Sequence, residues 1–137
     1  MIKTNELRVG NLVYIINRNS EVHLPNEIPF KVLTIGLDVE CLMYKIKPVT
    51  VEKWNKYYYK DLSPIPLTGE LLINFGFQKD RNGYFLGILS FSITSQNEFM
   101  ICINDRPIQI ICKYVHQLQN LYFSLTGSEL QLVNIEN

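Results

Sequence analysis

The segment from Lys113 to Gly127 constrains the fold most, because it is the one long stretch with a clear helical period. An α-helix advances about 100° per residue, and on that wheel the apolar side chains form one stripe about 120° wide. The stripe consists of Tyr114, Val115, Leu118, Leu121, Tyr122 and Leu125. Gly127 lies where a left-handed residue would end the helix. The pattern predicts a long C-terminal helix that packs on a sheet.

The opposite face of this helix carries no charge. It holds His116, Gln119, Asn120 and Phe123, at spacings of i, i+3, i+4 and i+7. A solvated helix face usually carries Lys and Glu, whereas the cores of protein interfaces are depleted in charge and enriched in aromatic residues. Two interpretations stay open: another element of the chain covers this face, or the four residues bind a protein partner or a second copy in a homodimer.

The first 62 residues have the pattern of a β-structure. Short β-branched and aromatic runs occur at residues 11–16, 30–36, 40–47 and 54–60, with turn residues between them. Such a set of short strands predicts a small SH3-like β-barrel or curled sheet. Two prolines in Ser63–Leu67 disfavour both helix and central strand. We therefore expect two subdomains, 1–62 and 63–137.

The second subdomain is expected to mix helix and sheet. Thr68 is a good N-cap for a short buried helix that ends at Gly76, and Asn82–Gly83 is a hairpin-type turn. Strands are expected at residues 84–93, 99–103 and 108–112, with Phe85, Leu89 and Phe91 on one side of the first. A last edge strand is expected at 130–133. The predicted fold class is α+β: a barrel-like unit, a helix, a three-stranded antiparallel meander and a long C-terminal helix.

Composition excludes several classes of function. The 13 basic and 13 acidic residues balance, so no overall charge favours nucleic acid or an anionic membrane. No apolar run approaches the roughly 20 residues of a membrane helix, and the N-terminal residues lack the apolar core of a signal peptide. The three cysteines are odd in number and form no Cys-x-x-Cys pair, which is typical of buried thiols in a cytoplasmic protein.

No motif indicates catalysis. His23 and His116 are far apart in the sequence and have no ligand spacing, so no metal site is expected. No Ser or Cys has the motif of an activated nucleophile, and no phosphate loop or dinucleotide fingerprint is present. We therefore expect a protein that is not an enzyme and has no cofactor.

One strip of the sequence could bind nucleic acid. It combines cations with aromatic rings: Lys45, Lys47, Lys53, Trp54, Lys56, Tyr57 and Tyr59. Aromatic rings between cations can stack on bases while the cations neutralise phosphates. The charge asymmetry is small, since residues 1–62 hold nine Lys/Arg and seven Asp/Glu, and residues 63–137 hold four and six. A sheet strand whose lysines keep an edge soluble is the other interpretation.

The chain resembles a family of small uncharacterised proteins from the genomes, prophages and mobile elements of gut anaerobes. The resemblance lies in Glu6–Val13, in Pro64–Leu72 with Phe75–Phe77, and above all in Tyr114–Gly127. It implies a bacterial or phage cytosolic protein and transfers no catalytic residue, because the family has no assigned activity. Taken together, these features predict a non-enzymatic protein-interaction or self-association module, with nucleic-acid binding as the alternative.

Overall fold

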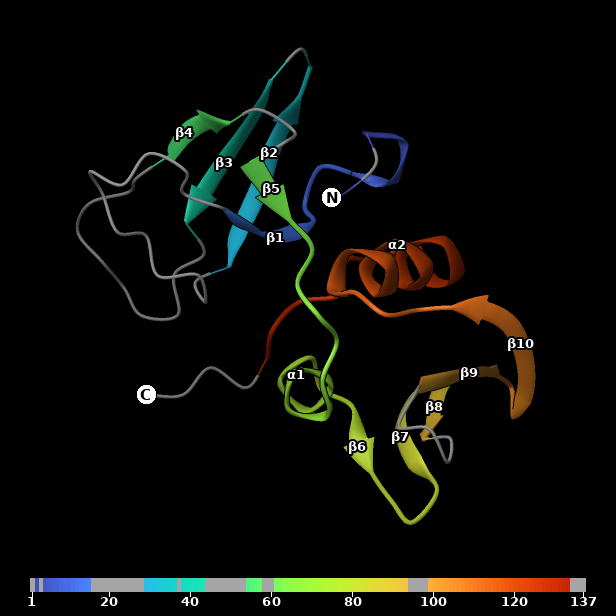
Figure 1. The fold of residues 1–137 in the computed structure, drawn as a ribbon. Helices are drawn as coiled ribbons and strands as arrows, with labels where there is room; N and C mark the ends of the chain where they lie inside the picture. Colours follow the sequence, from blue (N-terminus) through green and yellow to red (C-terminus); the bar gives the residue numbers. More distant parts are fainter. Residues whose placement is uncertain are drawn as a thin grey trace. The chain divides into compact units, whose positions relative to one another are not determined.

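The computed structural model describes residues 2, 4–15, 29–36, 38–43, 54–57, 61–93 and 99–133. These residues belong to two compact units, Met1–Ile65 and Pro66–Asn137, which are described separately (Figure 1). The division falls three residues after the boundary that the proline-rich break predicts.

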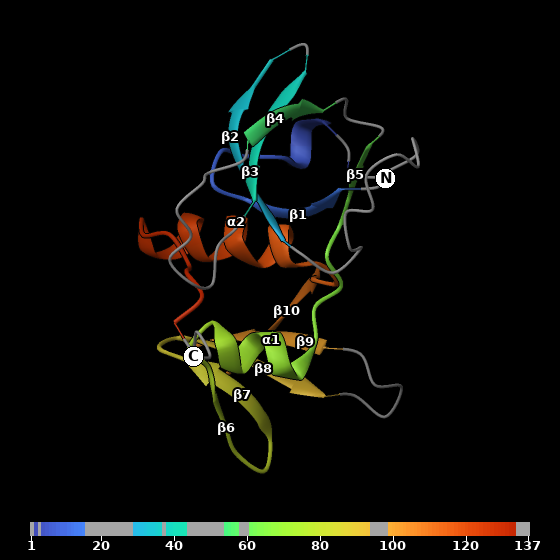
Figure 2. The ribbon, with the colours of Figure 1, turned by 90° about the vertical axis from the view of Figure 1, so that its left-hand side faces the viewer.

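The first unit is an antiparallel sheet in which hydrogen-bonded neighbours follow the order β4-β3-β2-β1-β5 (Figure 2). Its strands are β1 (Leu12–Ile15), β2 (Phe30–Ile35), β3 (Val39–Met43), β4 (Trp54–Tyr57) and β5 (Leu62–Ser63), and a short 3₁₀ turn, η1 (Thr4–Glu6), precedes them. Val13 pairs with Phe30, and Val32 pairs with Cys41. Because side chains alternate along a strand, this register places apolar residues on one face. The buried cluster consists of Ile2, Leu7, Val13, Ile15, Phe30, Val32, Val39, Cys41 and Leu62.

The turn before β1 explains part of the Glu6–Val13 motif. Asn11 is fully buried, and its Oδ1 accepts a hydrogen bond from the Arg8 backbone N–H at 2.7 Å. Gly10 has a φ of 96°, and its N–H donates to the Val32 carbonyl at 2.9 Å. The Val32 N–H donates in return to the Asn11 carbonyl at 2.9 Å. This turn therefore connects directly to β2 and fixes where the pairing of β1 begins.

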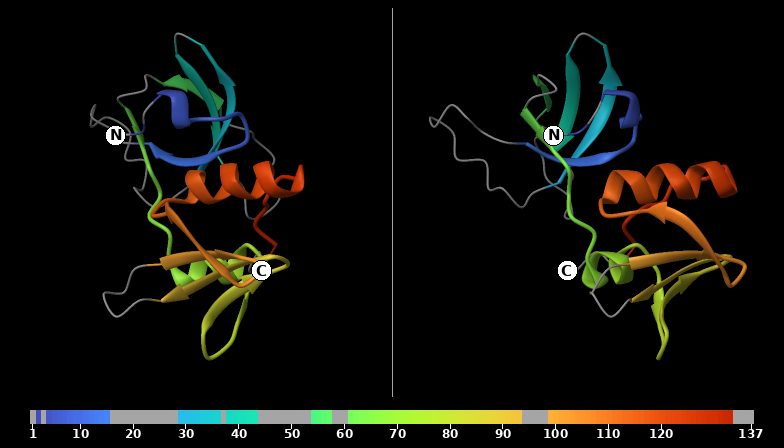
Figure 3. Two further views of the ribbon diagram at one scale, coloured as in Figure 1. Left: turned by 90° about the vertical axis from the view of Figure 1, so that its right-hand side faces the viewer. Right: turned by 45° about the vertical axis from the view of Figure 1, so that its right-hand side comes forward.

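The second unit contains a five-stranded antiparallel sheet with the order β10-β9-β8-β7-β6, together with two helices (Figure 3). Its elements are α1 (Gly69–Asn74), β6 (Gln78–Lys79), β7 (Gly83–Leu86), β8 (Leu89–Ile93), β9 (Phe99–Ile103), β10 (Arg106–Ile111) and α2 (Val115–Thr126). Each of the strands β7 to β10 pairs with the strand that precedes it in the chain.

One face of this second sheet packs against α1 (Figures 2 and 3). Tyr84, Leu89, Phe91 and Ile101 are buried on this face. The ring of Phe91 makes edge-on contacts with Phe77 and Phe99, at centroid distances of 5.6 and 5.8 Å. The Tyr84 hydroxyl occupies the place where a Cβ on Gly69 would lie, so the absence of a side chain at Gly69 lets α1 approach the sheet.

The helix ends follow ordinary capping chemistry. The Thr68 cap is confirmed, because Thr68 Oγ1 accepts a hydrogen bond from the Leu71 N–H at 3.2 Å. The left-handed end of α2 is also confirmed, because Gly127 has a φ of 73° and its N–H donates to the Phe123 carbonyl. The start of α2 has a cap that the sequence pattern does not predict. Gln117 Oε1 accepts hydrogen bonds from the backbone N–H groups of Lys113 and Tyr114, at 2.9 and 3.2 Å.

The predicted fold class is wrong. In the first unit, the described strands form an open order that begins at β4 and ends at β5, and no pairing between these two strands closes a barrel. The second unit has five strands in place of the expected three-stranded meander. The terminal helix α2 is not long, since its 12 residues make an ordinary helix of about three turns.

The strand error in the second unit comes from one glycine. Residues 84–93 form the hairpin β7–β8 and not one strand, because Gly87 adopts a φ of 60° and the chain reverses at Gly87–Ile88. The expected edge strand at 130–133 is likewise not a strand. That segment runs beside α1, where the Val133 N–H donates to the Asn74 carbonyl at 2.7 Å.

Candidate functional site

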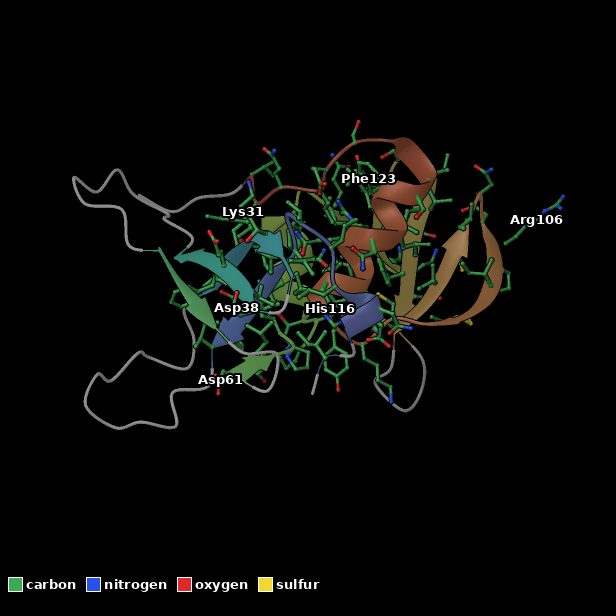
Figure 4. The ribbon with its side chains drawn as sticks, turned by 90° about the horizontal axis from the view of Figure 1, so that it is seen from above. Lys31, Asp38, Asp61, Arg106, His116 and Phe123 are labelled. Atoms are coloured by element: carbon green, nitrogen blue, oxygen red, sulfur yellow. The ribbon has the colours of Figure 1, made fainter. Side chains whose placement is uncertain are left out.

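The four predicted partner-binding residues of α2 differ in exposure. His116 and Gln119 are 1% and 2% exposed, and Asn120 is half-buried. Phe123 is 39% exposed and lies beyond them toward the C-terminal end of the helix (Figure 4). The imidazole ring of His116 stacks on the ring of Tyr114, with centroids 6.0 Å apart. The structure therefore does not present the four side chains as one open surface.

Whether a residue of α2 is buried depends more on its distance from the start of the helix than on the face of the helix on which it lies. Residues on both predicted faces of the first turns are buried, as Val115 and Gln119 show. The last turn, residues 123–126, is exposed throughout, including Leu125, which the apolar stripe predicts to be in the core. No residue of α2 is charged. We call the residues Phe123, Ser124, Leu125 and Thr126 the α2 end.

The predicted nucleic-acid strip is only partly described. Lys45, Lys47, Lys53 and Tyr59 lie outside the described residues. Trp54, Lys56 and Tyr57 belong to β4, where the register places them opposite Leu42, Glu40 and Val39 of β3. The strip as a binding surface stays a prediction.

A second surface lies on the sheet of the second unit, on the face away from α1. It is a hollow of about 460 Å³ over β7, β8 and β9, here called the β7–β9 hollow. Its lining includes Asp80, Phe85, Ile88, Ser90, Cys102 and Asp105. Phe85 pairs with Ser90, which pairs in turn with Cys102, so these three residues form one row across the strands. Phe85 is 37% and Ile88 45% exposed.

The sequence prediction places Phe85 on the wrong face. It puts Phe85 beside Leu89 and Phe91, because it treats residues 84–93 as one strand. The turn at Gly87 changes the pairing, so that Tyr84 opposes Phe91 and Phe85 opposes Ser90. A glycine inside a strand pattern indicates a bend or bulge, so Gly87 was the residue from which this turn, and with it the exposed position of Phe85, could have been predicted.

Tight turns hold both ends of the hollow. At one end, Asp80 Oδ1 accepts hydrogen bonds from the backbone N–H groups of Asn82 and Gly83, at 2.8 and 3.1 Å. At the other end, Asn104 and Asp105 form a turn with φ values of 50° and 64°, and the Asn104 N–H donates to the Ile88 carbonyl at 2.9 Å. Asp80 and Asp105 therefore both belong to tight turns, and the side chain of Asp80 is held by two backbone hydrogen bonds.

Two of the three thiols are poorly suited to act as nucleophiles. Burial raises the pKa of Cys41 and of Cys112 to about 12, so both thiols stay protonated at neutral pH. Cys102 is half-buried in the β7–β9 hollow. Within the described ranges, no group of three His, Cys, Asp or Glu residues could hold a metal ion. In the same part of the chain, every helix is too short or too polar to cross a membrane.

No protein-family model, curated protein or solved structure matches this chain. The function is therefore inferred from the two surfaces that the structure describes, the α2 end and the β7–β9 hollow.

Proposed function

We propose that the protein is a non-enzymatic interaction module that binds a second copy of itself, or another protein, through the α2 end. One observation carries the proposal: Phe123 is 39% exposed in the last turn of a helix that has no charged residue, and Leu125, on the other side of that turn, is 36% exposed. Aromatic enrichment and depletion of charge distinguish the centre of an interface from the rest of a protein surface.

The α2 end is also well ordered, which favours binding. Gln117 caps the first turn, and Gly127 closes the last turn with a hydrogen bond to the Phe123 carbonyl. Thr126 Oγ1 donates to the Tyr122 carbonyl at 2.8 Å. A surface that is fixed before binding loses less conformational entropy in the complex, so a small apolar contact contributes more to affinity.

Other features support a non-enzymatic protein of the cytoplasm. The two thiols with raised pKa values are buried and protonated, which suits packing and not catalysis. All three cysteines are free thiols, and free thiols persist in a reducing compartment. The resemblance to proteins of anaerobe genomes and prophages points to a bacterial or phage protein in the cytosol of a bacterium.

The test is Phe123→Ala, compared with wild type by light scattering over a range of concentrations and by urea unfolding. We expect the variant to lose association while its free energy of unfolding falls by about 1.5 kcal/mol or less, below the 3–5 kcal/mol of a core Phe. Phe85→Ala is the matched control, because Phe85 is the same residue type at 37% exposure on the sheet. It should associate like wild type.

Two results decide against parts of this proposal. A wild type that stays monomeric at every concentration would leave only the second-protein form of the proposal. A core-sized loss of stability in Phe123→Ala would mark Phe123 as a packing residue and would contradict both forms.

A further inference from the structure

The β7–β9 hollow has the composition of a binding surface with an apolar floor. Phe85, Ser90 and Cys102 form its central row, and the partly exposed Ile88 stands at one end. Ser90, Ser92 and Gly83 are small, so a bound chain could come close to the sheet. The row also contains a large aromatic ring, which the sheet leaves partly open to solvent.

The charges that line the hollow are all negative. Asp80 lies at the turn before β7, and Asp105 lies at the turn after β9, which is the opposite end of the hollow. The lining residues include no Lys, Arg or His. Lys79 and Arg81 flank Asp80 in the chain and Arg106 follows Asp105, but none of these three cations lines the hollow. Arg106 is exposed and projects away from the sheet (Figure 4). The electrostatic complement of this lining is a cation, and an aromatic side chain such as Phe85 can also attract cations.

The length of the hollow favours a chain segment over a small ligand. Strand β7 has four residues, which at about 3.3 Å each span about 13 Å between the two acidic turns. An extended peptide of about four residues has the same length, and alternate side chains of such a peptide point to one face. Lys and Arg suit this place because they combine an apolar stem with a charged end.

We propose that the β7–β9 hollow binds an extended segment of a partner protein in which lysine or arginine alternates with apolar residues. The apolar stems lie on Phe85 and Ile88, and the charged ends face Asp80 and Asp105. This surface is separate from the α2 end, and the proposal does not depend on self-association.

The first experiment is isothermal titration calorimetry with three probes. They are a blocked hexapeptide of alternating lysine and valine, the same peptide with glutamate in place of lysine, and lysine amide. We expect the lysine peptide to bind, with an affinity that falls as salt rises, because exposed charges are screened. The glutamate peptide and lysine amide should show no binding. Equal binding of the two peptides, or of lysine amide and the lysine peptide, would overturn the proposal.

The second experiment removes the charges of the hollow. Asp80→Asn and Asp105→Asn should each weaken the lysine peptide by up to about fivefold, as expected for a partly exposed ion pair. Asn preserves both turns, because it accepts backbone hydrogen bonds and tolerates a positive φ. Glu70→Gln is the matched control, since Glu70 is an exposed carboxylate on α1 outside the hollow. It should bind like wild type.

The third experiment is binding of the same lysine peptide to Phe85→Ala and Phe123→Ala. Phe85→Ala should weaken it at least tenfold, and Phe123→Ala should bind it like wild type. Unchanged binding by the Asp80→Asn/Asp105→Asn double variant would overturn the proposal. Loss of peptide binding in Phe123→Ala alone would assign the peptide to the α2 end and not to the hollow.

Discussion

At the residue scale, two glycines of one hairpin have unequal importance. Gly83 is the first residue of β7 and Gly87 follows its last, and both have a positive φ, of 144° and 60°. A Cβ on Gly83 would overlap the backbone carbonyl of Phe91 on the neighbouring strand, whereas a Cβ on Gly87 would meet nothing within 4 Å. The first glycine is required by space and by conformation, and the second by conformation alone.

Gly83→Ala should therefore lower the free energy of unfolding by at least about 3 kcal/mol, because two backbones must move apart. Gly87→Ala should cost only about 1–2 kcal/mol, the strain of a left-handed alanine. Urea unfolding of both variants measures the difference. Equal losses would show that β7 and β8 are not as close at Gly83 as the structure has them.

At the scale of an element, α1 depends strongly on its ends. It has only six residues, and its one fully buried side chain is Leu72. Such a short helix forms few internal hydrogen bonds, and several backbone N–H groups of its first turn have no partner within the helix. The hydrogen bond to Thr68 satisfies one of these N–H groups and therefore contributes a large share of the helix's stability. The Phe75 and Gly76 N–H groups close the other end on the Leu71 and Ile73 carbonyls.

Replacing the Thr68 hydroxyl should destabilise the second unit through α1. We expect Thr68→Ala to lower the free energy of unfolding by about 1 kcal/mol, and Thr68→Ser to lower it by a few tenths at most, because Ser keeps the acceptor oxygen. Thermal or urea unfolding followed by circular dichroism gives both values. An equally large loss in the Ser variant would mean that the threonine methyl group, and not the cap, matters.

Features that depend on a single residue could be predicted from the sequence, whereas features that depend on strand pairing could not. The Thr68 and Gly127 caps depend on one side chain or one glycine, and the sequence shows both directly. The β7–β8 hairpin depends on how Tyr84 and Phe91 pair across a turn, and an alternating run looks the same whether or not it folds back at Gly87. The β7–β9 hollow follows from that pairing, so it could not be predicted once residues 84–93 were treated as one strand.

At the scale of the whole molecule, each unit contains one strongly buried thiol. Cys41 lies in the core of the first unit, and Cys112 lies between β10 and α2 in the second. Burial raises the pKa of each from 9.0 to about 12. The sequence could not predict which residues of α2 are buried. A helical period indicates on which face of the helix a residue lies, but it does not indicate which turns of the helix are packed against the rest of the protein.

These thiols predict a loss of stability at alkaline pH. A raised pKa in the folded state means that the folded protein retains the proton while the unfolded chain loses it above pH 9. Stability is therefore full below about pH 9 and falls until about pH 12, by about 1.4 kcal/mol per thiol at pH 10. Urea unfolding at pH 8 and pH 10 measures the fall. Cys41→Ala and Cys112→Ala should each lose about 1.4 kcal/mol less over this interval than wild type does, and identical losses would refute the thiol assignment.

The hydrogen bond between the Asn104 N–H and the Ile88 carbonyl joins the turn of the β9–β10 hairpin to the turn of the β7–β8 hairpin. One hydrogen bond at the rim of the hollow thus connects the turn at Ile88 with the turn at Asn104. The exchange of that proton with deuterium reports on both loops at once, since neither turn can open without releasing it. Hydrogen exchange at the Asn104 amide should therefore change when a peptide binds in the hollow, and it can be measured without any added label.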